Sequence, residues 1–204
     1  MSQATVRKKP RDKQEAILAA AAALFASRPF HEVRLEDVAA RAKVGKGTVY
    51  LYWSSKEALY LGLVRRGFAA VVARLHLELP ACEGRTWDEV RTVIRALIHF
   101  ANDHPGVYRI MRSGGLTPED PHLQQIRRTL TDLVHGVLLA GIKRGDLRDT
   151  EPALTTQYLL SFVRGVALYG PAHISAEDVE RHMLELLRHG LSGKSGAKQA
   201  RGRS

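Results

Sequence analysis

Apolar residues recur at intervals of three or four along almost the whole chain, and no other feature of the sequence constrains its fold as strongly. This interval is the period of an α-helix with one buried face. The first segment with this pattern carries Ile17, Ala20, Ala21, Leu24 and Phe25. Alternation of apolar and polar residues, which is typical of half-buried strands, is scarce. The sequence therefore predicts an all-α fold of about nine helices.

Capping side chains, glycine and proline set the expected bounds of these helices. Ser54 and Glu57 are spaced as a capping box at the start of the fourth helix. We expect a compact N-terminal domain at residues 12–60 and a larger helical domain at residues 61–190. The expected helices lie near residues 12–28, 35–42, 46–52, 54–79, 86–101, 105–111, 117–144 or 121–144, 150–169 and 175–190.

The positive charge of the chain is concentrated at its two ends. The formal net charge is +10, and residues 1–11 and 191–204 together hold eight of these charges with no acidic residue. Residues 1–11 are expected to form a basic, flexible arm, and residues 191–204 a basic, disordered tail. Because cations gain affinity for DNA by releasing its counterions, the arm is expected to contact phosphates. For the tail, solvation alone and contact with DNA are both open.

Residues 35–53 contain two short helical segments joined by about three residues, which is the helix-turn-helix pattern of DNA-binding proteins. Val49 and Trp53 are expected to bury the second segment against the first, whose apolar residues are Leu35, Val38, Ala39 and Ala42. The opposite side of the second segment carries Lys46, Gly47, Thr48, Tyr50 and Tyr52. Small side chains let a helix enter the major groove, and hydroxyl groups bond phosphate oxygens. Residues 12–60 are therefore predicted to bind DNA.

Lys56 falls in the first turn of the expected fourth helix, where the helix dipole disfavours a cation. The free N–H groups of such a turn bind anions. A DNA phosphate held between this terminus and Lys56 would remove the conflict. A solvated surface lysine is the alternative.

The run VGKGTVYLYWSSKEAL, at residues 44–59, resembles the signature of the TetR family of bacterial regulators. The resemblance covers approximately residues 12–60. It implies a three-helix DNA-binding unit that precedes a long fourth helix, followed by a helical domain for ligand binding and dimerisation. It also implies DNA contacts at Lys46, Thr48, Tyr50, Tyr52 and Lys56.

Three residues depart from the pattern of that family. Arg34 replaces a threonine cap, and its side chain is long enough to reach a phosphate instead. Lys43 occupies a turn position that favours glycine, so a positive φ is expected there. Gly45 replaces a capping serine, which weakens the cap of the second helix of the motif.

The helix expected at residues 150–169 has more apolar surface than one buried face requires. One stripe of it carries Leu154, Tyr158, Phe162, Val166 and Tyr169. A homodimer in which the last two helices pack against their copies as a four-helix bundle would cover this surface. The family resemblance implies the same arrangement. The expected interface comprises Tyr158, Phe162, Gly165, Val179, Met183 and Leu187.

The resemblance further implies a small-molecule pocket among the middle helices, at approximately residues 85–170. Apolar side chains mixed with a few polar groups suit such a pocket, although an ordinary core has a similar composition. The candidate lining residues are His99, Phe100, His104, Tyr108, Met111, His135, Phe162 and Tyr169.

Sequence signatures of catalysis and of metal binding are missing. Residues 45–48 lack the adjacent Lys-Ser/Thr pair of a phosphate-binding loop, and Cys82 has no neighbouring His or Lys to activate it. There is no nucleophile elbow and no metal-binding histidine cluster. We expect no enzymatic activity, no catalytic residue, no metal and no cofactor. With no membrane-length apolar run and no secretory signal, a cytoplasmic location without a membrane partner is expected.

These observations predict a sequence-specific transcriptional regulator that acts as a homodimeric repressor. Its expected partners are double-stranded operator DNA, a second copy of the chain and a small-molecule effector that relieves DNA binding. Two alternatives are an all-helical enzyme that uses the C-terminal domain, and a nonspecific nucleoid-type DNA binder. The affinity of a nonspecific binder would depend on salt and hardly on DNA sequence.

Overall fold

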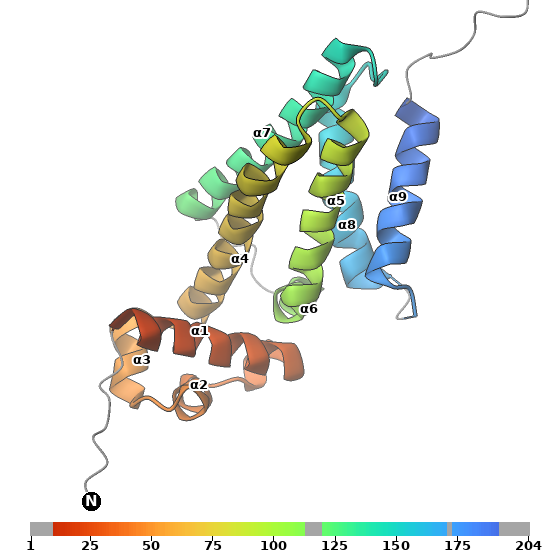
Figure 1. Ribbon diagram of the computed structural model, residues 1–204. Coiled ribbons are helices and arrows are strands. Elements are labelled where there is room, and N and C mark those ends of the chain that lie inside the picture. Colours follow the sequence, from red (N-terminus) through yellow and green to blue (C-terminus); the bar gives the residue numbers. More distant parts are fainter. Residues whose placement is uncertain (1–9, 113–119, 171–172, 192–204) are drawn as a thin grey trace, which may run out of the picture. The chain divides into compact units, whose positions relative to one another are not determined.

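A computed structural model of the 204-residue chain describes residues 10–112, 120–170 and 173–191. The side chains of residues 109–112 are outside this description. The helices occur in the order α1 (Pro10–Ser27), η1 (Phe30–Glu32), α2 (Leu35–Ala42), α3 (Lys46–Tyr52), α4 (Lys56–Glu78), η2 (Leu79–Cys82), α5 (Thr86–Asp103), α6 (Pro105–Arg112), α7 (Pro121–Arg144), α8 (Pro152–Tyr169) and α9 (Ala176–Leu191) (Figure 1).

The predicted all-α fold is confirmed: the described residues form nine α-helices and two short 3₁₀ helices, and no strand. Two boundaries refine the expectations. Helix α1 begins at Pro10 rather than Asp12, and α7 begins at Pro121, the second of the two starts that the sequence allowed. No helix within the described ranges combines the length and the apolar character needed to cross a membrane.

The capping box expected between Ser54 and Glu57 is wrong by one residue. Ser55 caps α4, because its hydroxyl oxygen accepts a hydrogen bond from the backbone N–H of Ala58 at 3.1 Å. The residue three positions after this cap is therefore an alanine, which cannot return the second hydrogen bond of a capping box. Lys56 becomes the first residue of α4.

The chain divides into two compact units. Unit 1 comprises residues 1–67 and 103–123, and unit 2 comprises residues 68–102 and 124–204. The domain bounds expected from the sequence, 12–60 and 61–190, stay a prediction. The basic arm lies largely, and the basic tail almost entirely, outside the described residues.

Unit 1 is built around α1, which packs against both α2 and α6. Phe25 of α1, Phe30 of η1 and Tyr60 of α4 form an aromatic cluster with ring centroids 5.4 to 6.1 Å apart. Phe25 and Tyr60 are almost fully buried. Such aromatic pairs contribute about 0.5–1.5 kcal/mol each beyond their burial. The cluster thereby fixes α4 to α1 and η1, the two elements that precede the expected helix-turn-helix.

Helix α6 belongs to unit 1, although it lies far along the chain from α1. Gly106 allows α6 to pack closely against α1. A Cβ atom at this position would lie 2.9 Å from the backbone nitrogen of Ala26 and 3.0 Å from the carbonyl carbon of Phe25. The hydroxyl of Tyr60 also donates a hydrogen bond to the carbonyl oxygen of Val107 at 3.3 Å. Helix α6 is thus fastened to both α1 and α4.

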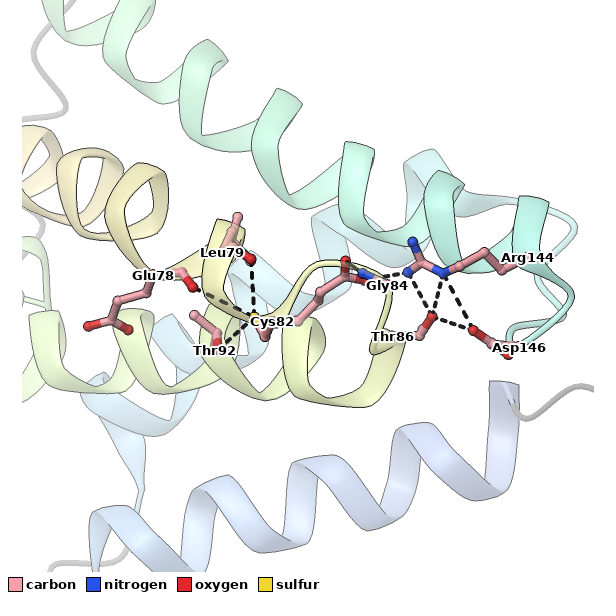
Figure 2. Close-up of polar contacts among 9 residues, drawn as sticks. Glu78, Leu79, Cys82, Gly84, Thr86, Thr92, Arg144 and Asp146 are labelled. Atoms are coloured by element: carbon pink, nitrogen blue, oxygen red, sulfur yellow. Dashed lines mark hydrogen bonds and ion pairs between the residues drawn. The ribbon is translucent and has the colours of Figure 1, made fainter.

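In unit 2, a polar network joins the start of α5 to the end of α7 (Figure 2). The guanidinium of Arg144 donates to the Thr86 hydroxyl at 2.7 Å, and this hydroxyl donates to Asp146 at 2.6 Å. Arg144 also pairs with the carboxylate of Glu89, which accepts the backbone N–H of Gly84 at 3.0 Å. Thr86 and Glu89 are both buried, so these polar groups require the partners that they have.

Candidate nucleic-acid interface

Helix α2 provides the scaffold of the helix-turn-helix. Its residues Leu35, Val38, Ala39 and Ala42 are buried, as the sequence predicted. At its start, the backbone N–H of Arg34 donates to the carboxylate of Asp37 at 3.3 Å, while the side chain of Arg34 lies exposed. The Arg34 guanidinium is therefore accessible to an external anion.

The turn between α2 and α3 has the conformation that the sequence predicted at Lys43. This residue has φ 54° and ψ 47°, in the left-handed region that favours glycine. The backbone N–H of Lys43 donates to Ala40 at 3.2 Å, and that of Val44 donates to Ala39 at 3.0 Å. These two hydrogen bonds satisfy two of the last four carbonyls of α2, and the chain turns sharply into α3.

Helix α3 is anchored by one fully buried residue, Val49. Gly45 is its N-cap, as expected, and provides no side-chain hydrogen bond. Trp53 is half-buried, and its ring occupies the space beside α4 that a side chain at Gly62 would fill. The role of Gly62 was missed from the sequence, where a glycine inside a helical segment was the available signal. Val49 and Trp53 together fix the orientation of the opposite face of α3.

That opposite face is open. Lys46, Gly47 and Tyr50 are exposed, and Thr48 and Tyr52 are half-buried. Leu51 was not among the predicted DNA contacts, yet it is the most exposed large apolar residue that the structure describes, at 83%. An exposed leucine beside an exposed tyrosine on so short a helix indicates a surface that another molecule covers.

Lys46, the cation of this face, already has a partner within the protein. The ammonium of Lys46 lies 2.5 Å from a carboxylate oxygen of Glu36 on α2. The hydrogen bond from Lys46 holds the pKa of Glu36 below its ordinary value, and the same bond raises the pKa of Lys46. Both groups are solvated, so the pair is ionised and open to exchange with an external anion.

Lys56 has an unexpected set of partners. Its ammonium donates to the carbonyl oxygen of Phe30 at 2.6 Å and lies 4.5 Å from the centre of the Phe30 ring. The carbonyl oxygen of His31 lies 3.5 Å away. These carbonyls compensate for the placement of a cation at a helix N-terminus. The predicted phosphate contact of Lys56 stays a prediction, and a structural role is now evident beside it.

The residues predicted to line a ligand pocket fall in both units. In unit 1, Tyr108 is buried and His104 is half-buried. In unit 2, Phe100 is buried and packs against Phe68 with ring centroids 5.0 Å apart. Of the other predicted residues in unit 2, His135 is half-buried. The side chains of His99, Phe162 and Tyr169 are exposed. The Met111 side chain lies outside the described residues.

His135 is held in a defined orientation by Thr156. The Thr156 hydroxyl donates to the carbonyl oxygen of Pro152 at 2.8 Å, so it accepts from His135 Nδ1 at 3.2 Å. The Nε2 atom of a neutral His135 is therefore an acceptor. Unit 2 also has two open cavities of about 560 and 430 Å³, and none of the predicted ligand residues lines either one.

The predicted dimer residues divide into exposed and buried groups. Tyr158 and Phe162 on α8 are exposed, at 61% and 40%, and Gly165 and Val179 are half-buried. Met183 is buried in the core of its own chain, and Leu187 is half-buried. Leu186, a further apolar residue of the expected last helix, is 51% exposed. The exposed apolar surface of α9 is thus centred on Leu186 rather than on Met183.

Comparisons with known proteins agree with this geometry. Residues 17–63 match the family model described as bacterial regulatory proteins, tetR family. The chain is 27% identical to the HTH-type transcriptional regulator RutR of Escherichia coli O157:H7, over 86% of this chain and 91% of that protein. It is 22% identical to the nucleoid occlusion factor SlmA of Idiomarina loihiensis, over 76% of this chain and 81% of that protein.

Solved structures show the same fold along most of the chain. The structure of the transcriptional regulator FadR from Bacillus subtilis, in complex with stearoyl-CoA, has a TM-score of 0.70 and 20% identity. This match covers 85% of the present chain and 96% of FadR. The family match coincides with the helix-turn-helix described above, and the all-helical fold extends beyond it. Residues 17–63 are therefore similar to the TetR family of bacterial regulatory proteins, and most of the chain shares the all-helical fold of a solved transcriptional regulator.

Proposed function

We propose that the chain is a homodimeric repressor, acting in the cytoplasm, whose binding to operator DNA is relieved by a small molecule. The observation that carries this proposal is the open face of α3, which is anchored from behind by the buried Val49. A rigidly held helix with small, hydroxylated, cationic and apolar groups on its open face suits the major groove. Residues 12–60 are the proposed DNA-binding domain and 61–190 the ligand-binding and dimerisation domain.

Within the DNA-binding face, each residue type has a distinct role. Arg34, Lys46 and Lys56 supply cations for phosphates, and the hydroxyls of Thr48, Tyr50 and Tyr52 supply neutral hydrogen bonds. Gly47 permits a close approach of the α3 backbone. We add Leu51 to this set, because an exposed aliphatic side chain on a groove-binding helix matches the methyl group of thymine.

The homodimer is supported by the apolar surface of the last two helices. Leu154, Tyr158, Phe162 and Tyr169 are exposed on α8, and Leu186 is exposed on α9. Neighbouring exposed apolar side chains along one face of a helix mark a surface that another protein chain or a ligand covers. A symmetric dimer places two α3 helices in successive major grooves, approximately 34–36 Å apart. The operator is then expected to be a palindrome with half-sites at this spacing.

The relief of DNA binding requires a connection from the ligand-binding domain to α3. Helix α4 begins in unit 1 and continues into unit 2, which makes it the proposed lever. Within unit 1, Arg65 of α4 pairs at 3.1 Å with Asp120, which caps α7 through the backbone N–H of Leu123 at 2.6 Å. Helix α6 packs on α1 at Gly106. A ligand that shifts any of these helices would respace the two α3 helices.

The DNA part of the proposal is tested by selecting fragments of the source genome that the purified chain binds. A small set of palindromic sites would support a sequence-specific regulator. Fragments spread without sequence preference would favour the nonspecific nucleoid-type alternative. Tyr52→Phe should weaken binding to all sequences and lower the salt slope by about one phosphate or less. An unchanged affinity and slope would remove Tyr52 from the interface.

The ligand part is tested by a thermal-shift screen that includes acyl-CoA thioesters, since FadR was crystallised with one. A compound that stabilises the chain is then titrated with and without operator DNA. Coupling is reciprocal, so operator DNA should weaken ligand binding by the same factor by which the ligand weakens DNA binding, approximately 5- to 150-fold. Equal ligand affinities in the two titrations would refute the coupling for that compound.

A further inference from the structure

The Glu36–Lys46 ion pair lies within the DNA-binding face itself. Glu36 is in the first turn of α2, and Lys46 is the first residue of α3. Their charged atoms lie 2.5 Å apart, and both side chains remain about half exposed, at 48% and 60%. The Lys46 ammonium also lies 5.8 Å from the centre of the exposed Tyr50 ring. The pair therefore connects the two helices of the motif on the side that faces DNA.

The electrostatic environment keeps both partners of this pair charged. Glu36 occupies a helix N-terminus, where the dipole favours an anion, whereas Lys46 occupies the N-terminus of α3, where the dipole disfavours a cation. The pKa of Glu36 is lowered first by Lys46 and further by Arg34, a second predicted phosphate contact. Glu36 is thus an anion at neutral pH, beside two of the cations that are proposed to contact DNA phosphates.

We propose that Glu36 competes with DNA for the ammonium of Lys46 and thereby limits the affinity of the DNA-binding face. This inference rests on the proposed function. It gives Glu36, which lies in α2 rather than in α3, a role in setting the affinity for DNA. A lysine that is already neutralised by a carboxylate gains less from meeting a phosphate, because one ion pair is exchanged for another. The remaining Glu36 carboxylate also repels the phosphate that Lys46 approaches.

Glu36→Gln should therefore tighten DNA binding. Because this ion pair is exposed, the tightening should be at most about fivefold. The gain should occur for operator and non-operator duplexes alike, because Lys46 is freed for phosphates of any sequence. It should decrease at high salt, where the competition is screened.

A double-mutant cycle isolates the pair from the general loss of a negative charge. Glu36→Gln is measured in the natural chain and in a Lys46→Met background, against one operator duplex and one scrambled duplex. The tightening should be present in the first background and lost in the second. Glu32→Gln is the matched control, since it removes an exposed acid of unit 1 whose nearby partner is His31 rather than a lysine. Its effect should be smaller than that of Glu36→Gln.

A second measurement does not involve DNA. The pKa of the Glu36 carboxyl group, followed by NMR, should rise when Lys46 is replaced by methionine. An unchanged pKa would show that the pair does not form in solution and would overturn the inference. Equal effects of Glu36→Gln in both backgrounds, or weaker binding, would also overturn it. If the natural chain binds no duplex at all, the proposed function itself is wrong. This result differs from binding that Glu36→Gln leaves unchanged, which contradicts only the inference about Glu36.

Discussion

The ammonium of Lys56 donates a hydrogen bond to the carbonyl oxygen of Phe30 at 2.6 Å and lies 4.5 Å from the centre of the same residue's ring. The first residue of α4 is thereby fastened to η1, which precedes the helix-turn-helix. Because Phe30 also stacks on Phe25, this contact continues into the core of unit 1. Lys56 is therefore a structural residue as well as a predicted phosphate contact.

Replacing Lys56 should for this reason affect stability and DNA binding together. Lys56→Met removes a charged hydrogen bond and a cation–π contact, and we expect a loss of about 1–2 kcal/mol in the free energy of unfolding. Urea unfolding measures the loss of stability, and titration with DNA measures the change in affinity. Lys56→Arg keeps the charge and is the control. Unchanged stability of Lys56→Met would contradict the structural role.

Gly106 and Gly136 should respond in opposite ways to the same substitution. Gly106→Ala places a Cβ atom 2.9 Å from the backbone of Ala26, so α6 must move away from α1, at a cost of about 1–3 kcal/mol. Gly136 lies in α7, and a Cβ atom there meets nothing within 4 Å. Gly136→Ala should therefore stabilise the chain by about 0.5–1 kcal/mol. Thermal unfolding measures the stability of both variants. A stabilised Gly106→Ala variant would refute the close contact between α6 and α1.

Arg144 should contribute more to stability than a neighbouring exposed arginine. Arg144→Met leaves the buried carboxylate of Glu89 without its cation and Thr86 without a donor, and we expect a loss of about 2–3 kcal/mol. The Arg148 side chain makes no hydrogen bond or ion pair within the described residues, so Arg148→Met should change stability by no more than about 0.5 kcal/mol. Urea titration of both variants at neutral pH makes the comparison. Equal effects would mean that the network adds nothing to stability.

The proposed dimer surface can be tested with two exposed apolar residues on different helices. Phe162→Glu introduces a charge into the proposed interface on α8 and should give a monomer, because an unpaired charge is not tolerated in an apolar bundle. Leu77 on α4 is even more exposed, at 79%, so Leu77→Glu is the control and should remain a dimer. Sedimentation gives the mass, and circular dichroism verifies folding. A folded Phe162→Glu dimer would place the interface elsewhere.

Asp178 gives a prediction about pH. It accepts a hydrogen bond from the Ser175 hydroxyl at 2.7 Å, and this bond together with Arg181 lowers its pKa. A carboxyl group with a lowered folded pKa stabilises the folded state above its unfolded pKa, and this contribution is lost as the pH falls through the folded value. The start of α9 should therefore stay intact down to about pH 4. An NMR titration midpoint for Asp178 at or above about 3.9 would contradict this.

Several features of the proposed DNA-binding face could be predicted from the sequence because they depend on local contacts. The helical spacing of Leu35, Val38, Ala39 and Ala42 predicted one buried side of α2, and the structure buries all four. The positive φ at Lys43 was expected from the TetR-like pattern, which favours glycine at this turn position. Helical period, capping and turn geometry involve residues within a few positions of one another, so a single sequence contains the required information.

Other features were decided only by contacts between residues far apart in the chain. The period of α9 identifies Met183 and Leu186 equally as apolar, and only the packing of unit 2 buries the first and exposes the second. Likewise, the partner of Lys56 lies 26 residues away, and the neighbour of Gly106 belongs to α1. A helical pattern determines which residues share a face. Tertiary packing determines which of two apolar faces is covered and which carbonyl a long, flexible lysine reaches, because these depend on distances that the local pattern does not contain.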